Sequence, residues 1–322
     1  MAFITLFVVI TLNFAIFRVF IPFDPTSLML DPRMPEELKQ NLRREWGLED
    51  PLFPNQFLTY LKNLFTWNYG RQFNQGHTEI APEMAWRLRN TVLIMGSALV
   101  GTIMLGIPIG VLVAARRGSK LDVSTIGFAL FTYGVPTFFI QLLFLLVFTS
   151  YWHAWFGWSL IPRAGIVTSP PPKDMLGFIG DVAWHAIGPI VTLTLAGFGF
   201  WALYTRNILV DTLTEDYILT ATAKGLKERT VLLRHAFRSV LPPIVTMIAL
   251  AIPGIVTGAI ITESIFSWPG IGSWYINALM NKNHPVTQAV LYNYAFLMIG
   301  ANLIADFAYG ILDPRIRVGT RR

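Results

Sequence analysis

The chain lacks cysteine and has few charged residues. None of its 322 residues is Cys, and 14% are Asp, Glu, Lys or Arg, whereas soluble domains are typically about a quarter charged. The absence of cysteine excludes disulfides, thiolate nucleophiles and zinc or iron–sulfur sites with Cys ligands. The low charge disfavours a soluble enzyme.

Sequence motifs for catalysis and for ATP binding are also missing. The chain has no G-x-x-x-x-G-K-[ST] loop to cradle phosphates, no H-E-x-x-H pair to hold zinc, and no G-x-S-x-G elbow around a nucleophilic serine. Its five histidines are scattered. We therefore expect a protein that is not an enzyme and holds no metal or cofactor itself. Any energy source must be another subunit or an ion gradient.

Long hydrophobic runs, in contrast, are abundant. Hydrophobic residues make up 53% of the chain and the mean hydropathy is +0.51. Uncharged runs of more than about twenty residues can cross a hydrocarbon core of about 30 Å. The sequence predicts an all-α polytopic membrane protein with six transmembrane helices, bounded by charges, Pro or Gly, at 2–21, 91–115, 123–147, 183–205, 240–262 and 287–305.

The first apolar segment, 1–21, is interpreted as a transmembrane helix and not as a signal peptide. It is longer than a usual signal core, and no small-residue cleavage site follows before Pro22. No basic residue precedes the segment. That is unusual for a segment that starts in the cytoplasm, and it leaves open a start upstream of Met1.

The distribution of basic residues predicts the orientation in the membrane. The loops 116–122 and 206–238 and the tail 315–322 carry three, six and four Lys or Arg residues. The loops 148–182 and 263–286 together hold only Arg163, Lys173 and Lys282. Because cytoplasmic loops are enriched in positive charge, both termini are expected in the cytoplasm of a multi-pass protein of the cell membrane. The formal net charge of +6 is thus explained by topology, and no nucleic-acid partner is expected.

The chain divides into three parts on this topology. Segment 22–90 forms an external domain, in which Pro35–Glu45 and Pro54–Phe65 are expected to be short helices. Segment 91–322 forms a five-helix core that contains a long cytoplasmic loop at 206–240.

The segment Thr212–Leu241 is the most informative part of that loop. A loop that only reverses the chain needs about two to eight residues, whereas this one is patterned as two short amphipathic helices that meet at Gly225. Thr212 and Glu215 have the spacing of a capping box at the start of the first helix. One interpretation is an elbow that lies on anionic lipid. The other is a turn that docks into a groove of a cytoplasmic partner.

The residues of this loop resemble a known family. Y-x-x-T-A-x-A-K-G-L, followed by E-R-x-V-L-L-R-H-A-F-R, is similar to the cytoplasmic "EAA" loop in permease subunits of binding-protein-dependent ABC importers, specifically the dipeptide, oligopeptide and nickel branch. One departure is that Leu219, Thr220 and Ala221 occupy the positions of Glu-Ala-Ala in the general family.

Three other stretches carry the same resemblance, which covers nearly the whole chain. Tyr133–Phe138 is similar to the S-V-P-x-F element of this branch, and Glu263–Gly272 to its E-x-I-F-S-x-P-G-L-G segment. The C-terminal pattern N-x-x-x-D-x-x-Y-x-x-x-D-P-R-I-R is present at Asn302, Asp306, Tyr309 and Asp313–Arg317.

The resemblance implies the type I ABC importer permease fold and a set of partners. They are a homologous second permease, expected to be a paralogue; two ATPase subunits that hold ATP and Mg; an external substrate-binding protein; and the lipid bilayer. This chain would form half of a translocation path for dipeptides or oligopeptides, with oligosaccharides or nickel chelates as the alternative. A self-sufficient channel or secondary transporter is a further alternative, against which the lack of a convincing inverted repeat argues. The third alternative is a scaffold or interaction protein that has no transport path.

Two groups of site residues follow. The resemblance implies coupling to the ATPases through Glu215, Tyr217, Thr220, Ala221, Ala223, Lys224, Gly225, Leu226, Glu228 and Arg229. Polar groups and prolines at membrane depth are expected to face the bundle interior or an aqueous cavity, and the candidates for the path or its gate are Tyr133, Pro136, Gln141, Glu263, Asn302 and Asp306. A purely structural role is the favoured alternative for Asp306, and for Glu263 both roles stay open.

Overall fold

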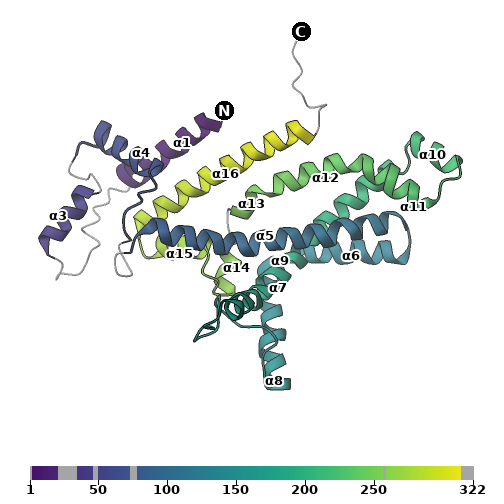
Figure 1. Ribbon diagram of the computed structural model, residues 1–322, viewed down its shortest axis with the longest axis horizontal. Coiled ribbons are helices and arrows are strands. Elements are labelled where there is room, and N and C mark those ends of the chain that lie inside the picture. The colour runs from purple at the N-terminus through teal and green to yellow at the C-terminus, as the bar shows by residue number, and fades with distance from the viewer. Residues whose placement is uncertain (1, 21–34, 46–49, 73–77, 257–258, 313–322) are drawn as a thin grey trace, which may run out of the picture.

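Nearly all of the chain that the structure describes is helical (Figure 1). The computed structural model covers residues 2–20, 35–45, 50–72, 78–256 and 259–312. Within these residues, β-type pairing is limited to one antiparallel bridge between Arg71 and Glu79. The predicted all-α class is therefore confirmed.

The N-terminal helices agree with the sequence. α1 (Ala2–Ala15) continues as the π-helical segment η1 (Ile16–Phe20). The two short helices expected in the external segment are present as α3 (Glu36–Glu45) and α4 (Phe57–Phe65), the latter preceded by π-helical turns at Leu52–Gln56. α1 packs beside the C-terminal helix, coloured yellow in Figure 1.

Two long helices form the centre of the molecule. α5 (Ile80–Ala114) begins eleven residues before the predicted start of its span. The charges at its start do not end the helix, because Arg87 pairs with Glu83 one turn earlier at 2.5 Å. α9 (Met175–Thr212) likewise extends beyond the predicted 183–205, and it contains Pro189.

Glycine brings these two helices close together. A Cβ at Gly106 would lie 2.7 Å from the carbonyl oxygen of Phe198, and one at Gly110 would lie 2.6 Å from that of Ala202. Both glycines are on α5, four residues apart, and both carbonyls are on α9. The G-x-x-x-G spacing therefore serves close helix packing.

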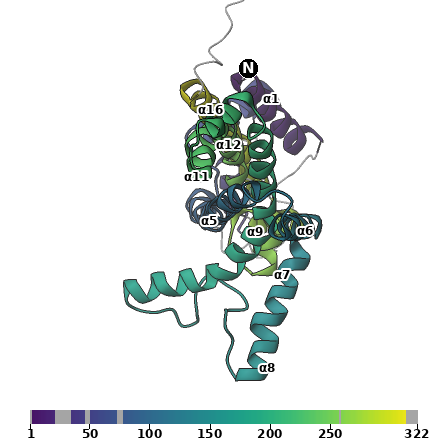
Figure 2. The same cartoon turned by 90° about the vertical axis from the view of Figure 1, so that its right-hand side faces the viewer.

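The third predicted span, 123–147, is not one helix. It consists of α6 (Lys120–Gly134) and α7 (Thr137–Leu145), and α7 continues through π-helical turns, Leu146–Tyr151, into α8 (Trp152–Phe156). The break lies at Val135 and Pro136, because a residue before proline avoids the helical conformation and Val135 is extended (φ −79°, ψ 130°). Figure 2 shows the helix that runs from α7 to α8 projecting from the rest of the molecule at its α8 end, while α7 packs against α9 and α14.

The fifth predicted span, 240–262, is broken as well. Its parts are α12 (Phe237–Ala251), α13 (Pro253–Val256) and α14 (Ile260–Ile265), with Pro253 at the first break. A short helix that the sequence did not predict, α15 (Ile271–Met280), follows before α16 (His284–Leu312).

Several helices are able to cross a membrane. In the described part of the chain, four segments are long and apolar enough by composition: Ile80–Ala114, Thr137–Phe156, Met175–Thr212 and Glu228–Ile255. The apolar segment Ile4–Phe20 is shorter. A multi-pass membrane protein is thus confirmed. The count of six transmembrane helices and the cytoplasmic location of both termini stay predictions.

Hydrophobic side chains gather in a core at each end. The core near α1 and α16 contains buried residues from α1, α4, α5, α15 and α16, among them Phe14, Tyr60, Met84, Trp274 and Val290. The core at the other end joins α5, α9, α10 and α12, with Leu209, Ile218, Ala221, Val231 and Ile244.

The loop between α8 and α9 is held against α9. The backbone N–H and the hydroxyl of Thr168 donate to the carboxylate of Asp181, at 2.6 and 2.7 Å. The indole N–H of Trp184 donates to the carbonyl of Leu160 at 3.1 Å. The N-terminal end of α9 is therefore fixed to this loop.

Candidate functional site

The predicted two-helix loop is present in the structure. α10 (Asp216–Ala223) is followed by a turn and by α11 (Glu228–Thr230), which passes through the π-helical segment η4 (Val231–Ala236) into α12. Gly225 in the turn has φ +76°, and its N–H donates to the carbonyl of Thr222 at 2.9 Å. Residues other than glycine rarely adopt this backbone conformation, so Gly225 determines the shape of the turn.

One face of the loop packs against the membrane helices. Ile218 and Ala221 of α10 are buried together with Leu209 of α9 and Val231 of η4. The hydroxyls of Tyr217 and Ser239 are 2.8 Å apart and hydrogen bonded. These contacts make α10, the turn and the start of α12 one packed unit.

The other face is open. Nine of the ten residues predicted to couple to an ATPase are exposed. The exception is Ala221, which is 6% exposed and belongs to the packed face. Leu219 also lies on this open face and is 56% exposed, although the sequence analysis did not place it at the site. An apolar side chain within the resembling loop motif was the signal that could have identified it.

The capping box predicted for this loop is wrong. The hydroxyl of Thr212 donates to the carbonyl of Ile208 at 2.8 Å, and α9 extends to Thr212. Glu215 is the N-cap residue of α10, and its side chain makes no cap hydrogen bond. The spacing of the box is correct, but the preceding helix is longer than the hydrophobic pattern indicated.

An ion pair that the sequence analysis missed joins α6 to α9 near this loop. Arg206 donates from Nε and Nη2 to the two carboxylate oxygens of Asp122, at 2.9 and 2.8 Å. The N–H of Gly118 also donates to this carboxylate at 2.9 Å. The Arg206 hydrogen bonds, helped by that of Gly118, hold the pKa of Asp122 below its ordinary value.

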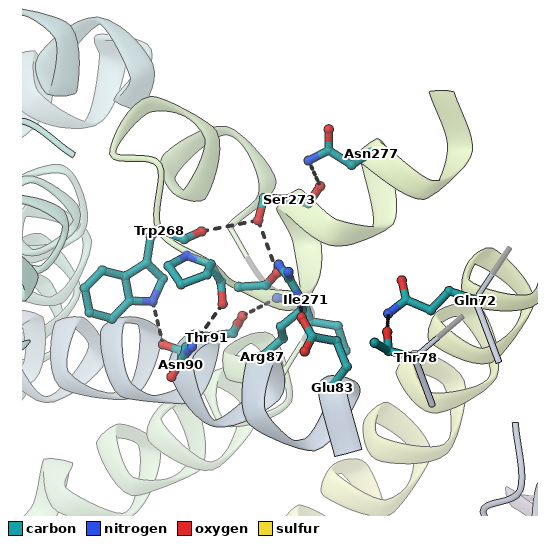
Figure 3. A network of polar contacts seen from close by, with 12 residues as sticks. Gln72, Thr78, Glu83, Arg87, Asn90, Thr91, Trp268, Ile271, Ser273 and Asn277 are labelled. Carbon is teal, nitrogen blue, oxygen red and sulfur yellow. Dashed lines mark hydrogen bonds and ion pairs between the residues drawn. The ribbon is translucent and has the colours of Figure 1, made fainter. Parts of the chain in front are cut away.

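A second polar network surrounds Glu263 near the other end of α5, and Figure 3 labels its partners Thr91 and Ser273. Glu263 is completely buried. One of its carboxylate oxygens accepts from the hydroxyl of Thr91 at 2.6 Å, and the other accepts from the N–H of Ser273 at 2.7 Å. Thr91 in turn accepts from the N–H of Ile271 at 2.9 Å. The carboxylate thus connects α14, α5 and the start of α15.

The linker between α14 and α15 has further bonds to α5 (Figure 3). The side-chain amide of Asn90 donates to the carbonyl of Pro269, and the indole N–H of Trp268 donates to the carbonyl of Asn90, both at 3.0 Å. Trp268 is 1% exposed. The segment resembling E-x-I-F-S-x-P-G-L-G is therefore a rigid corner fixed to α5.

The candidate path residues do not form one cluster. Gln141 is completely buried, and its side-chain amide donates to the hydroxyl of Thr262 at 2.7 Å, next to Glu263 in the chain. Tyr133, Pro136 and Asn302 are exposed. Asp306 lies on α16, but its side chain and the segment 313–317 are outside the described residues. In this conformation Glu263 and Gln141 connect helices and contact no open space.

The described residues contain no group of three or more His, Cys, Asp or Glu side chains that could hold a metal ion. The polar clusters around Glu263 and Asp122 consist of hydrogen bonds between helices. Their arrangement positions the helices relative to one another.

Comparison with known proteins agrees with the arrangement of the helices. Residues 106–318 match the family described as "Binding-protein-dependent transport system inner membrane component", and residues 1–108 match its N-terminal counterpart. The oligopeptide transport system permease protein AppB of Bacillus subtilis is 33% identical over 92% of this chain and 90% of its own length. The dipeptide transport system permease protein DppB of Escherichia coli K12 is 33% identical over 97% of this chain and 95% of its own length.

A solved structure shares the fold. The MetNI methionine ABC transporter in an inward-facing conformation contains a chain that aligns with a TM-score of 0.55 and 16% sequence identity, covering 71% of this chain and 96% of that one. Family membership implies ATPase subunits and an external binding protein as partners. The chain belongs to the binding-protein-dependent transport system inner membrane components and is a permease subunit of an ABC importer.

Proposed function

We propose that this chain forms half of the translocation path of an ATP-driven importer for dipeptides or oligopeptides. The support is that relatives named as dipeptide and oligopeptide permeases match more than nine tenths of the chain. The second half of the path would come from a paralogous permease. Two separate ATPase subunits would hold the ATP and Mg, because this sequence has no P-loop.

The open face of the α10–α11 turn is the observation that carries the coupling role. Leu219 and Leu226 are 56% and 40% exposed, and Lys224, Glu228 and Arg229 beside them are exposed too. An apolar centre with a charged rim is typical of protein interfaces. Acidic residues such as Glu228 disfavour the alternative of an elbow on anionic lipid.

The geometry suggests how movement of this turn reaches the membrane. Because α10 is packed on Leu209 and Val231, a push on the turn is transmitted to α9 and α12 together. The Asp122–Arg206 ion pair carries the same displacement to α6. Charges on the open face would fix the register of docking more than the affinity.

We assign the candidate path residues to two roles. Tyr133, Pro136 and Asn302 are exposed and are available to a path between two permeases. Glu263 and Gln141 would hold the α14–α15 corner in place as part of an outer gate, which fits their complete burial.

The test is to tag the chain, extract it gently from its native membrane and identify the retained proteins by mass spectrometry. We expect a second permease, P-loop ATPases and a binding protein. In vesicles, this complex should take up a labelled dipeptide only with ATP. An excess of unlabelled peptide should suppress uptake, whereas an oligosaccharide or nickel chelate should not. Uptake by the chain alone without ATP would contradict the proposal.

A further inference from the structure

The loop between α8 and α9 also reaches the α14–α15 corner. The N–H of Gly165 donates to the carbonyl of Phe266, the residue that caps the C-terminus of α14, at 3.0 Å. Gly165 has φ +90°, a conformation that residues other than glycine rarely adopt. Thr168, three residues later, is bound to Asp181 of α9 by two hydrogen bonds. Residues 159–168, which we call the clasp, therefore fasten α9 to the corner.

The clasp is held more firmly on α9 than on the corner. Both hydrogen bonds from Thr168 go to the carboxylate of Asp181, whose side chain is 9% exposed. Hydrogen bonds to an ionised group are roughly twice as strong as neutral ones. The indole N–H of Trp184 in α9 adds a bond to the carbonyl of Leu160. The bond from Gly165 to the corner joins two neutral backbone groups, so it is the weaker fastening.

The corner, in turn, is held more firmly on α5 than on α9. Its hydrogen bonds to α5 include those of the buried carboxylate of Glu263 and the buried indole of Trp268. Against α9 the corner packs with apolar groups. A Cβ at Gly188 would lie 2.7 Å from the ring of Phe266, and Trp268 shares an apolar cluster with Ala186. Apolar contact is non-directional, so these surfaces can part without breaking a hydrogen bond between them.

We propose that the clasp is a releasable fastener between α9 and the corner. The inference rests on the proposed role of the corner in a gate of the transport path. When the gate opens, the clasp stays on α9 through Asp181 and the corner stays on α5 through Glu263. The two part at the bond between Gly165 and Phe266. Because α9 is packed against α10 at its other end, a displacement of the α10–α11 turn moves α9 and the clasp together relative to the corner.

The test uses the native complex and takes advantage of the absence of cysteine from this chain. The first variant combines Ala164→Cys and Ser267→Cys, two exposed positions that adjoin the bond between the clasp and the corner. A short reagent with two methanethiosulfonate groups links them, and reduction removes the link. The matched variant combines Thr168→Cys and Asp181→Cys, which the same reagent links within the fastening that the proposal keeps closed. Each single-cysteine variant receives the same treatment as a control.

Dipeptide uptake after linking is compared with uptake by the same variant before linking. The link between positions 164 and 267 should lower uptake at least about tenfold, because a gate that is tied shut cannot open, and reduction should restore it. The link between positions 168 and 181 should leave uptake unchanged. Unchanged uptake after the first link, or an equal loss after both, would overturn the proposal.

Hydrogen exchange gives a second readout that does not depend on peptide uptake. The wild-type complex is compared without nucleotide and with ATP trapped by vanadate in the presence of the co-purified binding protein. The fragment around Gly165 should exchange faster in the trapped state. The amides of Ile271 and Ser273, which are bonded to Thr91 and Glu263, should stay protected in both states.

The two readouts separate this inference from the proposed function. Equal protection of the Gly165 fragment in both states would overturn the clasp even if the wild type takes up dipeptides. Faster exchange of that fragment in a complex that takes up no dipeptide would support the clasp and contradict the assignment to peptides.

Discussion

The α-carbon of Gly270 lies directly against the carboxyl group of Glu263. A Cβ at position 270 would overlap the carboxyl carbon and both its oxygens. The neighbouring Gly272 is close to the same group, since a Cβ there would lie 3.1 Å from Oε2. The P-G-I-G stretch thus leaves room for a buried carboxylate between two short helices.

Gly270→Ala should therefore displace Glu263 and destabilise the protein. Overpacking in a dense interior typically costs about 1–3 kcal/mol, and the broken hydrogen bonds would add to it. Thermal unfolding of the solubilised complex measures the effect. Gly180→Ala in α9 is the control, because a Cβ there has no neighbour within 4 Å. Equal stability of the two variants would show that the corner is not tightly packed.

Glu263→Gln should be destabilising although it preserves shape. Both carboxylate oxygens accept hydrogen bonds, one from Thr91 and one from Ser273. An amide offers one acceptor, so its NH₂ would face either the hydroxyl proton of Thr91 or the N–H of Ser273. An unmade buried hydrogen bond costs about 1–3 kcal/mol.

The measurement for Glu263→Gln is again the unfolding temperature, with Glu83→Gln as the control. Glu83 pairs with Arg87, and its side chain is 31% exposed. Loss of such a partly exposed pair costs about 0–1 kcal/mol. If Glu83→Gln lowers the unfolding temperature more than Glu263→Gln does, the hydrogen bonds of Glu263 do not hold α14, α5 and α15 together.

The Asp122–Arg206 pair predicts a pH dependence of stability. The pKa of Asp122 is lowered in the folded state, so this carboxylate stabilises the fold above its unfolded pKa of about 3.9. That contribution is lost as the pH falls from there through the folded pKa. Asp122→Asn should lower stability near neutral pH. It should also make stability fall less steeply as the pH becomes acidic.

Thermal unfolding of wild type and Asp122→Asn between neutral pH and pH 3 tests this dependence. Glu37→Gln, an exposed carboxylate on α3, is the control and should follow the wild type. If Asp122→Asn keeps the full acid dependence of the wild type, the pair does not contribute.

Gly225→Pro should uncouple transport from ATP hydrolysis. Proline fixes φ near −65°, whereas Gly225 has φ +76° and donates its N–H to Thr222. Membrane insertion should be retained, because no side chain lies within 4 Å of a Cβ at this position. Gly225→Asn is the control, since Asn tolerates positive φ.

Dipeptide uptake and ATP hydrolysis by the reconstituted complex are the measurements for these turn variants. Uptake should fall at least about tenfold in Gly225→Pro, corresponding to about 1.4 kcal/mol or more of lost coupling, and it should be largely retained in Gly225→Asn. Normal uptake in Gly225→Pro would mean that another element contacts the ATPases.

Local patterns in the sequence predicted the features that depend on neighbouring residues. The turn at Gly225 follows from residue types and short spacings. The same reasoning placed helices at α3 and α4. The breaks at Pro136 and Pro253 were missed because hydrophobicity continues across them, although proline was the available signal.

Contacts between distant residues could not be predicted in this way. Thr91 and Glu263 are 172 residues apart, and Asp122 and Arg206 are 84 apart. Nothing in a single sequence states that these side chains meet. The burial of Ala221 also depends on packing against α9, so its similarity to a family motif did not reveal which way it faces.

The unbroken course of α9 has a mechanical consequence. At 1.5 Å per residue its 38 residues span about 57 Å, more than the roughly 40–45 Å of a whole bilayer. One end adjoins the loop at Thr168 and the other leads into α10. Pro189 divides the rod into unequal arms, residues 175–188 and 190–212. A small swing imposed at the α10 end is therefore carried to the other end of α9 along one continuous helix.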